Sequence, residues 1–320
     1  MSKALLHRRY QHILRSMISS SAKLLAVLIS SALCCTTVVH AKSEPLRLKS
    51  SSVWHVDYAE ERCRLARTFG VAKEEVVLLL DQFGPGEYFR LTLGGLPVRT
   101  LKPNGEAAVQ FGPAEESQSL YFLNGNLGKG KPALIFSSGM RIAGPSAAEK
   151  LASANAKSEL GFEYAPIDPK RAAAVRYLEI GKPLRRSVIL ETGSMKGPLA
   201  ALDKCNEELM THWGIDVGKH KTLIRPPIPR SSPGNWIVSS DYPSKMLQEG
   251  QPSLVEFRLN IGENGLPTAC HIQMTTRPKE FDEAVCKALM RRAKFEPALD
   301  ADAKPLASYW RSKVYFRLPG

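Results

Sequence analysis

The stretch that decides the fold of the last part of the chain is LVEFRLNIGENGLPTACHIQMTT, residues 254–276. Between Val255 and Ile261, apolar and polar side chains alternate, which is the pattern of a strand with one buried face. Asn264 and Gly265 accept the positive φ values of a tight hairpin turn, so we expect the chain to return as an antiparallel strand. The sequence therefore predicts a β-hairpin here.

A helix and a closing strand follow this hairpin. Residues 279–294 gather apolar side chains on one helical face, with acids in the first turn and bases in the last, as the helix dipole favours. Residues 308–318 again alternate between apolar and basic side chains. Hairpin, helix and strand together predict a small unit in which helices pack on an antiparallel sheet.

Short apolar runs and turn signals alternate through residues 48–220. The turns are marked by Gly84-Pro85-Gly86, Gly94-Gly95, Asn104-Gly105 and Asn124-Gly125. Several short strands at this spacing predict a β-rich sandwich or barrel. We expect a helix from about Lys196 to Trp213, after a turn in which Gly193 bends the chain and Ser194 caps the helix. The predicted fold class of the chain is therefore α+β.

A proline-rich segment separates these two regions. Residues 221–235 contain four prolines and show no periodicity, so we expect a stiff, extended linker. This linker would divide the chain into a β-rich domain at 48–220 and a C-terminal domain at 236–320.

The N-terminus contains an apolar run, LLAVLISSALCCTTVV, at residues 24–39. The run is shorter than the roughly 20 residues of a membrane helix. It ends at Val39-His40-Ala41, which suits signal-peptide cleavage. We therefore predict a signal peptide at residues 1–41, with Met17 as an alternative start, and a periplasmic protein. The alternative is an uncleaved anchor that holds the protein in the inner membrane, facing the periplasm, which would be its only membrane contact.

Cleavage would leave four cysteines, and an even number in an exported protein suggests two disulfides. Cys270 falls on the second hairpin strand and Cys286 on the helix expected to cover that sheet. We therefore expect these two to pair. Cys63 and Cys205 would then form the second bond within the β-rich domain. Four free, buried thiols in a cytosolic protein are the alternative.

The charge and the polar motifs exclude several function classes. The net charge is +13, and five of the Lys and Arg residues precede residue 24. The others are spread along the chain without a nucleic-acid-binding motif, so we expect a solvated basic surface and no nucleic acid partner. No zinc-type spacing and no phosphate-binding loop occurs. The sequence therefore predicts no metal and no cofactor.

No catalytic constellation is evident either. Glu191-Thr192-Gly193-Ser194 differs by one residue from the Asp-Thr-Gly-Ser of aspartic proteases, but the second copy that this chemistry needs is missing. We interpret the four histidines after the leader as surface residues: His55, His212, His220 and His271. The sequence therefore predicts a protein that is not an enzyme.

Several motifs between residues 235 and 320 resemble the C-terminal domain of TonB. They are Tyr242-Pro243 before a short helix, the hairpin at Asn264-Gly265, the run RRAKFEPA at 291–298, and the terminal strand. The resemblance implies a periplasmic domain that binds a TonB-dependent outer-membrane receptor by adding the receptor's extended segment to the final strand. It also implies the residues that contact the partner: Tyr242, Pro243, Tyr309, Arg311, Lys313 and Tyr315.

Two features depart from TonB. Residues 24–41 lack the Ser-x-x-x-His pattern of its membrane anchor, and a β-rich domain stands where TonB has a long proline-rich spacer. We therefore predict a periplasmic protein that binds an envelope partner, either in energy-coupled transmembrane transport as an energy transducer or as an adaptor. The alternatives are an exported hydrolase with its site in residues 50–220 and a structural cell-envelope protein that self-associates as a homodimer.

Overall fold

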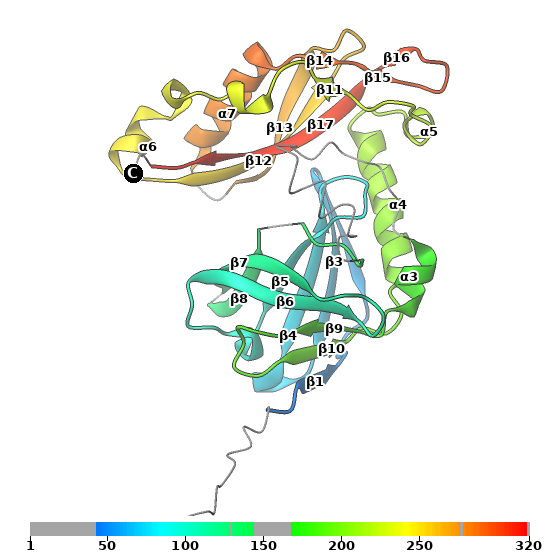
Figure 1. Ribbon diagram of the computed structural model, residues 1–320, viewed down its shortest axis with the longest axis vertical. Coiled ribbons are helices and arrows are strands. Elements are labelled where there is room, and N and C mark those ends of the chain that lie inside the picture. Colours follow the sequence, from blue (N-terminus) through cyan, green and yellow to red (C-terminus); the bar gives the residue numbers. More distant parts are fainter. Residues whose placement is uncertain (1–42, 129, 138, 144–167, 276–277, 319–320) are drawn as a thin grey trace, which may run out of the picture. The chain divides into compact units, whose positions relative to one another are not determined.

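The computed structural model describes residues 43–128, 130–137, 139–143, 168–275 and 278–318 of the 320-residue chain. Helices and strands are both present, with a large curled sheet first and a smaller sheet packed by helices at the C-terminal end (Figure 1). The predicted α+β fold class is confirmed. The predicted leader, residues 1–41, lies outside the described residues. No helix in the described part of the chain is long and apolar enough to cross a membrane.

The large sheet contains ten strands in the order β1-β10-β9-β6-β7-β8-β5-β4-β3-β2. Its strands are β1 (Leu46–Lys49), β2 (His55–Ala59), β3 (Arg62–Phe69), β4 (Val76–Gln82), β5 (Arg90–Gly94), β6 (Asn104–Gly112), β7 (Gln118–Leu127), β8 (Lys131–Phe136), β9 (Tyr177–Ile180) and β10 (Val188–Glu191). Neighbours pair antiparallel except β1 and β10, which are parallel.

The sheet curls until its first strand meets β3. Ser50 forms an isolated bridge with Phe69, and two backbone hydrogen bonds flank this bridge. Ser51 N donates to Thr68 O at 2.9 Å, and Gly70 N donates to Lys49 O at 2.8 Å. The curled sheet therefore closes, as in a barrel, and pairing removes the edge that β1 would otherwise expose.

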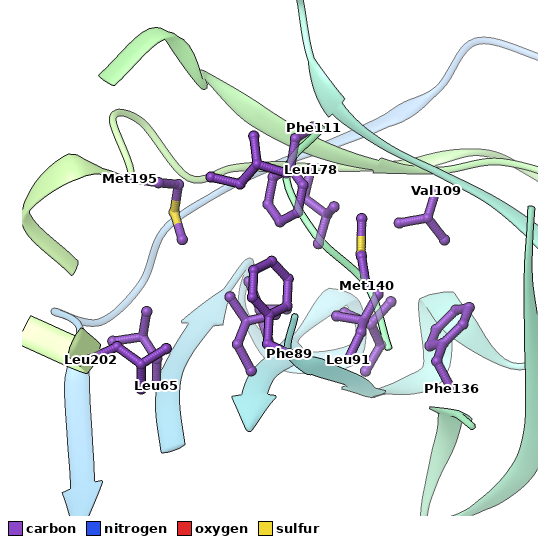
Figure 2. Close-up of a cluster of buried hydrophobic side chains, with 14 of the residues drawn as sticks. Leu65, Phe89, Leu91, Val109, Phe111, Phe136, Met140, Leu178, Met195 and Leu202 are labelled. Atoms are coloured by element: carbon purple, nitrogen blue, oxygen red, sulfur yellow. The ribbon is translucent and has the colours of Figure 1, made fainter. Parts of the chain in front are cut away.

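The interior of the curled sheet is a packed hydrophobic core (Figure 2). Phe89 and Phe111 meet edge to face, with ring centroids 5.8 Å apart. Figure 2 shows Met140, Leu178 and Met195 around these two rings. Alternate residues of each strand point inward, as a period of two requires.

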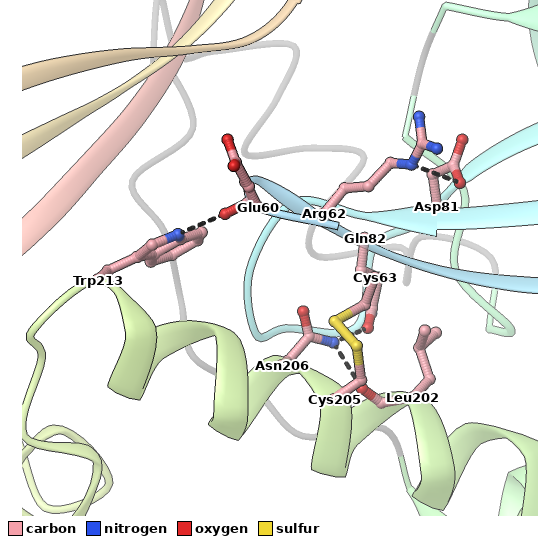
Figure 3. The surroundings of a disulfide bond; sticks show 9 residues. All are labelled: Glu60, Arg62, Cys63, Asp81, Gln82, Leu202, Cys205, Asn206 and Trp213. Carbon is pink, nitrogen blue, oxygen red and sulfur yellow. Dashed lines mark hydrogen bonds and ion pairs between the residues drawn. A yellow bond between two sulfur atoms is a disulfide. The ribbon is translucent and has the colours of Figure 1, made fainter. Parts of the chain in front are cut away.

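Helix α4 (Lys196–His212) is joined to β3 by the disulfide Cys63–Cys205 (Figure 3). Beside this bond, the Asn206 amide nitrogen donates to Gln82 Oε1 at 2.6 Å, so a buried polar pair reinforces the contact. The residue at the N-cap position is Met195, not the predicted Ser194, and its side chain is buried. The short helix α3 (Pro169–Ala174), capped by Asp168, precedes β9.

The C-terminal sheet contains the predicted hairpin and closing strand. Its strands are β12 (Ser253–Ile261), β13 (Pro267–Thr275) and β17 (Ser308–Phe316), and β12 is central. Helix α7 (Lys279–Arg292) covers one face, and the disulfide Cys270–Cys286 joins it to β13. Both disulfides thus have the predicted pairing. Gly265 has φ +77°, and a Cβ there would lie 2.0 Å from Phe295 O, so the turn requires glycine.

The predicted linker lies along the C-terminal sheet instead of running free. Within it, β11 (Ile228–Pro229) pairs with β14 (Phe295–Glu296), and Ile224 N donates to Leu299 O at 3.1 Å. Trp236, directly after the linker, is buried between Phe295 and Trp310. The remaining short elements are α5 (Val217–His220), α6 (Ser244–Gln248), β15 (Ala298–Leu299), β16 (Pro305–Leu306) and four 3₁₀ turns at Ala72–Glu74, Leu96–Val98, Pro233–Asn235 and Ser239–Asp241.

Candidate partner-binding edge

Strand β17 lies at the edge of the C-terminal sheet. It pairs with β12 along its whole length, from Ser253 opposite Phe316 to Ile261 opposite Ser308. Among the described residues, no strand pairs with its other side. An edge strand of this kind presents backbone donors and acceptors to which an extended peptide can add as a further strand.

The side chains of β17 alternate between two environments. Trp310, Val314 and Phe316 belong to the core beneath α7. Four of the residues predicted to contact a partner lie on the opposite face. Tyr309 and Arg311 come first on this face, and Lys313 and Tyr315 follow.

The first two of these residues are covered by other parts of the chain. Tyr309 is 8% exposed, and its ring centroid lies 5.4 Å from that of Trp213 and 5.3 Å from that of His220. The guanidinium of Arg311 lies against Gly84. Lys313 and Tyr315, in contrast, are exposed. The accessible part of this face is therefore its C-terminal half.

Tyr242 and Pro243 lie at the same end of β17. The Tyr242 ring packs on Phe281 and on Phe316, the last residue of β17, with centroids 5.6 and 5.3 Å apart. Its hydroxyl donates to Gln251 O at 2.6 Å. Pro243 occupies the N-cap position of α6. Tyr242 therefore supports the end of the edge strand from inside, with its hydroxyl already bonded within the chain.

The helix-free face of the C-terminal sheet makes charged contacts that the sequence analysis missed. Arg258 on β12 is almost fully buried and donates two hydrogen bonds to the Glu61 carboxylate, at 2.6 and 3.0 Å. Its guanidinium also lies 4.0 Å from the centroid of the Trp213 ring. Glu256 forms an ion pair with Arg90 of β5 through one hydrogen bond. Strand periodicity identified these positions as polar but could not show that another part of the chain covers them.

His220 is buried, so its interpretation as a surface histidine is wrong. Its ring stacks on Tyr309 at an interplanar angle of 17°, and Nε2 lies 2.7 Å from Ser308 Oγ. Burial lowers the pKa of His220 to about 4, and nearby Asp216 opposes this shift. His220 is therefore neutral at neutral pH. His271 is partly exposed, and its pKa is lowered first by burial and then by Arg258.

A cavity of about 470 Å³ borders β17. One wall is formed by residues of β17, among them Arg311, Ser312 and Lys313. The other wall is formed by residues of the curled sheet and its loops, among them Phe83 and Tyr88. Within the described residues, no group of three or more His, Cys, Asp or Glu side chains is placed to hold a metal ion. The arrangement suits recognition of a peptide.

These elements form a small α+β domain in the C-terminal part of the chain, and β17 is an edge strand of its sheet. Residues 238–318 match the family model described as the Gram-negative bacterial TonB protein C-terminal. The predicted resemblance to that domain is thereby confirmed for these residues. The family is known for its contacts with outer-membrane receptors and for an envelope location. No curated protein and no solved structure matches the chain.

Proposed function

We propose that this protein binds a partner in the periplasm through its TonB-type C-terminal domain, by strand addition to the outer edge of β17. The observation that carries the proposal is this edge, because β17 pairs on one side only among the described residues and belongs to the segment that matches the TonB C-terminal model. Lys313 and Tyr315 are the side chains offered to the partner beside this edge.

The two disulfides support the proposed periplasmic location. Such bonds persist in oxidising compartments such as the bacterial periplasm and are rare in the cytosol. The partner would be an outer-membrane receptor if the protein acts in energy-coupled transport, or another periplasmic protein if it acts as an adaptor. The proposed organisation is a leader at 1–41, a β-rich domain at 48–220, a proline-rich segment at 221–235 and the binding domain at 236–320.

Site-specific photo-cross-linking in a Gram-negative host tests this proposal. A benzoyl-phenylalanine probe replaces Tyr315, which is 47% exposed on β17. A matched probe replaces Leu101, which is 93% exposed and outside every strand. We expect an envelope protein to be cross-linked from position 315 and not from 101, and mass spectrometry of the adduct distinguishes a receptor from an adaptor partner. Equal labelling from both positions, or none from 315, would refute binding at this edge.

A further inference from the structure

The cavity beside β17 has two walls of different origin. Arg311, Ser312, Lys313 and Tyr315 are contributed by β17 itself. Facing them are side chains from the end of β4, from β5 and from the loop between them. Those residues are Asp81, Phe83, Tyr88, Phe89 and Arg90.

The cavity borders the edge of β17 and not only one of its faces. Four consecutive residues, 310–313, line it. Successive residues of a strand point to opposite faces, so a surface touched by both sets includes the backbone edge between them. A peptide strand added to β17 would therefore lie within this cavity.

The wall facing β17 is fixed in place by bonds within the chain. Arg90 forms an ion pair with Glu256 of β12, and Gln273 of β13 donates to Phe83 O at 3.0 Å. Phe89 and Met140 exchange two backbone hydrogen bonds of 2.8 Å. A wall that is ordered before binding loses little conformational entropy when a ligand arrives.

Among the described residues that line this cavity, cations outnumber carboxylates. The cations are Arg90, Arg311 and Lys313, and the carboxylates are Asp81 and Glu256. Asp81 already accepts two hydrogen bonds from a further cation, Arg64, at 2.6 and 2.9 Å. An arriving carboxylate would therefore find complementary charge.

Burial lowers the pKa of Arg311, because the low-dielectric surroundings disfavour its cation. The rings of Phe83, Tyr88 and Tyr315 add apolar surface on which aliphatic or aromatic side chains can pack.

We propose that this cavity binds an acidic, extended peptide segment of the partner, held between β17 and the Phe83–Arg90 wall. The curled sheet then acts as a specificity determinant for the partner, in addition to the edge strand. This inference rests on the proposed function and deepens it.

A random heptapeptide library, displayed and selected on the full chain with its disulfides intact, tests the inference. We expect the selected peptides to be enriched in Asp and Glu. The affinity of the best one, measured by fluorescence anisotropy, should fall roughly tenfold in Tyr88→Ala and in Lys313→Glu, which is the scale of losing one anchor contact.

Two further variants serve as matched controls. Arg317→Glu makes the same charge change next to β17 but outside the cavity, and Tyr121→Ala removes a tyrosine of similar exposure from β7 (41% against 45% for Tyr88). Both control variants should bind the selected peptide with an affinity within about twofold of that of the wild type. Near-ultraviolet circular dichroism verifies that each variant is folded.

The outcomes separate this inference from the proposed function. Peptides without acidic enrichment, or an unchanged affinity in Tyr88→Ala, would overturn the role of the wall. Cross-linking from position 315 could still succeed in that case, and the edge would then bind without help from the curled sheet. If cross-linking from position 315 fails as well, both proposals fail together.

Discussion

His220 is the residue at which stability should respond most directly to pH. Its pKa is about 4 in the folded protein, against about 6.5 in an unfolded chain. The unfolded state therefore takes up a proton first as pH falls, and stability is lost between pH 6.5 and 4. The shift in pKa corresponds to about 3 kcal/mol of folding stability, and this stability is fully present above pH 6.5.

We predict that His220→Gln removes this component of acid sensitivity, because glutamine retains a polar group for Ser308 and does not titrate. The measurement is the free energy of unfolding in urea at several pH values between 4 and 8 for both proteins. The wild-type curve should fall relative to the variant curve below pH 6.5. Two parallel curves would show that the ring is solvated.

The ion pair that joins β12 to the turn before β3 should contribute more to the free energy of unfolding than ion pairs at the surface. Arg258 and Glu61 have side chains 1% and 20% exposed, whereas Arg230 and Glu296 are 51% and 48% exposed. Removing one partner of a buried pair leaves an uncompensated charge in low dielectric.

We therefore predict that Arg258→Ala costs about 3 kcal/mol or more in the free energy of unfolding. The matched variant Arg230→Ala should cost less than about 1 kcal/mol, because solvent screens its pair. Urea denaturation at neutral pH measures both. Similar losses in the two variants would mean that the Arg258 pair is solvated.

The two disulfides close loops of very different length, with sequence separations of 16 and 142 residues. In the chain-entropy model, loops of these sizes stabilise by about 3 and 5 kcal/mol. We predict that the double variant Cys63→Ser/Cys205→Ser loses more stability than Cys270→Ser/Cys286→Ser, measured by urea denaturation without reductant. The reverse order would show that native packing, and not loop entropy, decides the effect.

The elements that the sequence predicted best are those with strong local periodicity. Strand β12, helix α7 and strand β17 follow their apolar patterns closely. Strand β1 was not predicted, because its four residues gain their place by parallel pairing with β10. Strand β3 was not predicted either, because its arginines hide the alternation and Arg64 is matched by Asp81 on the neighbouring strand.

The candidate site was predictable only in part, for a related reason. A period of two in β17 separates Trp310 from Arg311, but it does not show which polar side chains another part of the chain will cover. Tyr309 is covered and Tyr315 is exposed, and only the tertiary structure makes this distinction. Whether the six predicted residues contact a partner stays a prediction.

A measurement of the intact mass of the whole protein tests its export and the oxidation of its cysteines together. We predict that the protein recovered from the periplasm of a Gram-negative host begins at Lys42. Its mass should be lower than that of the reduced chain by four hydrogens, two for each disulfide. A species that keeps residues 1–41 and sediments with the inner membrane would instead indicate the anchored alternative.

The full-length register between β17 and β12 has a mechanical consequence. Nine residue pairs join these strands, from Ser253 with Phe316 to Ile261 with Ser308. A ligand strand pulled along the direction of β17 would load the hydrogen bonds of both ladders in shear, so that they share the tension instead of breaking one after another. In the proposed complex, the C-terminal sheet would therefore hold its ligand under a longitudinal pull.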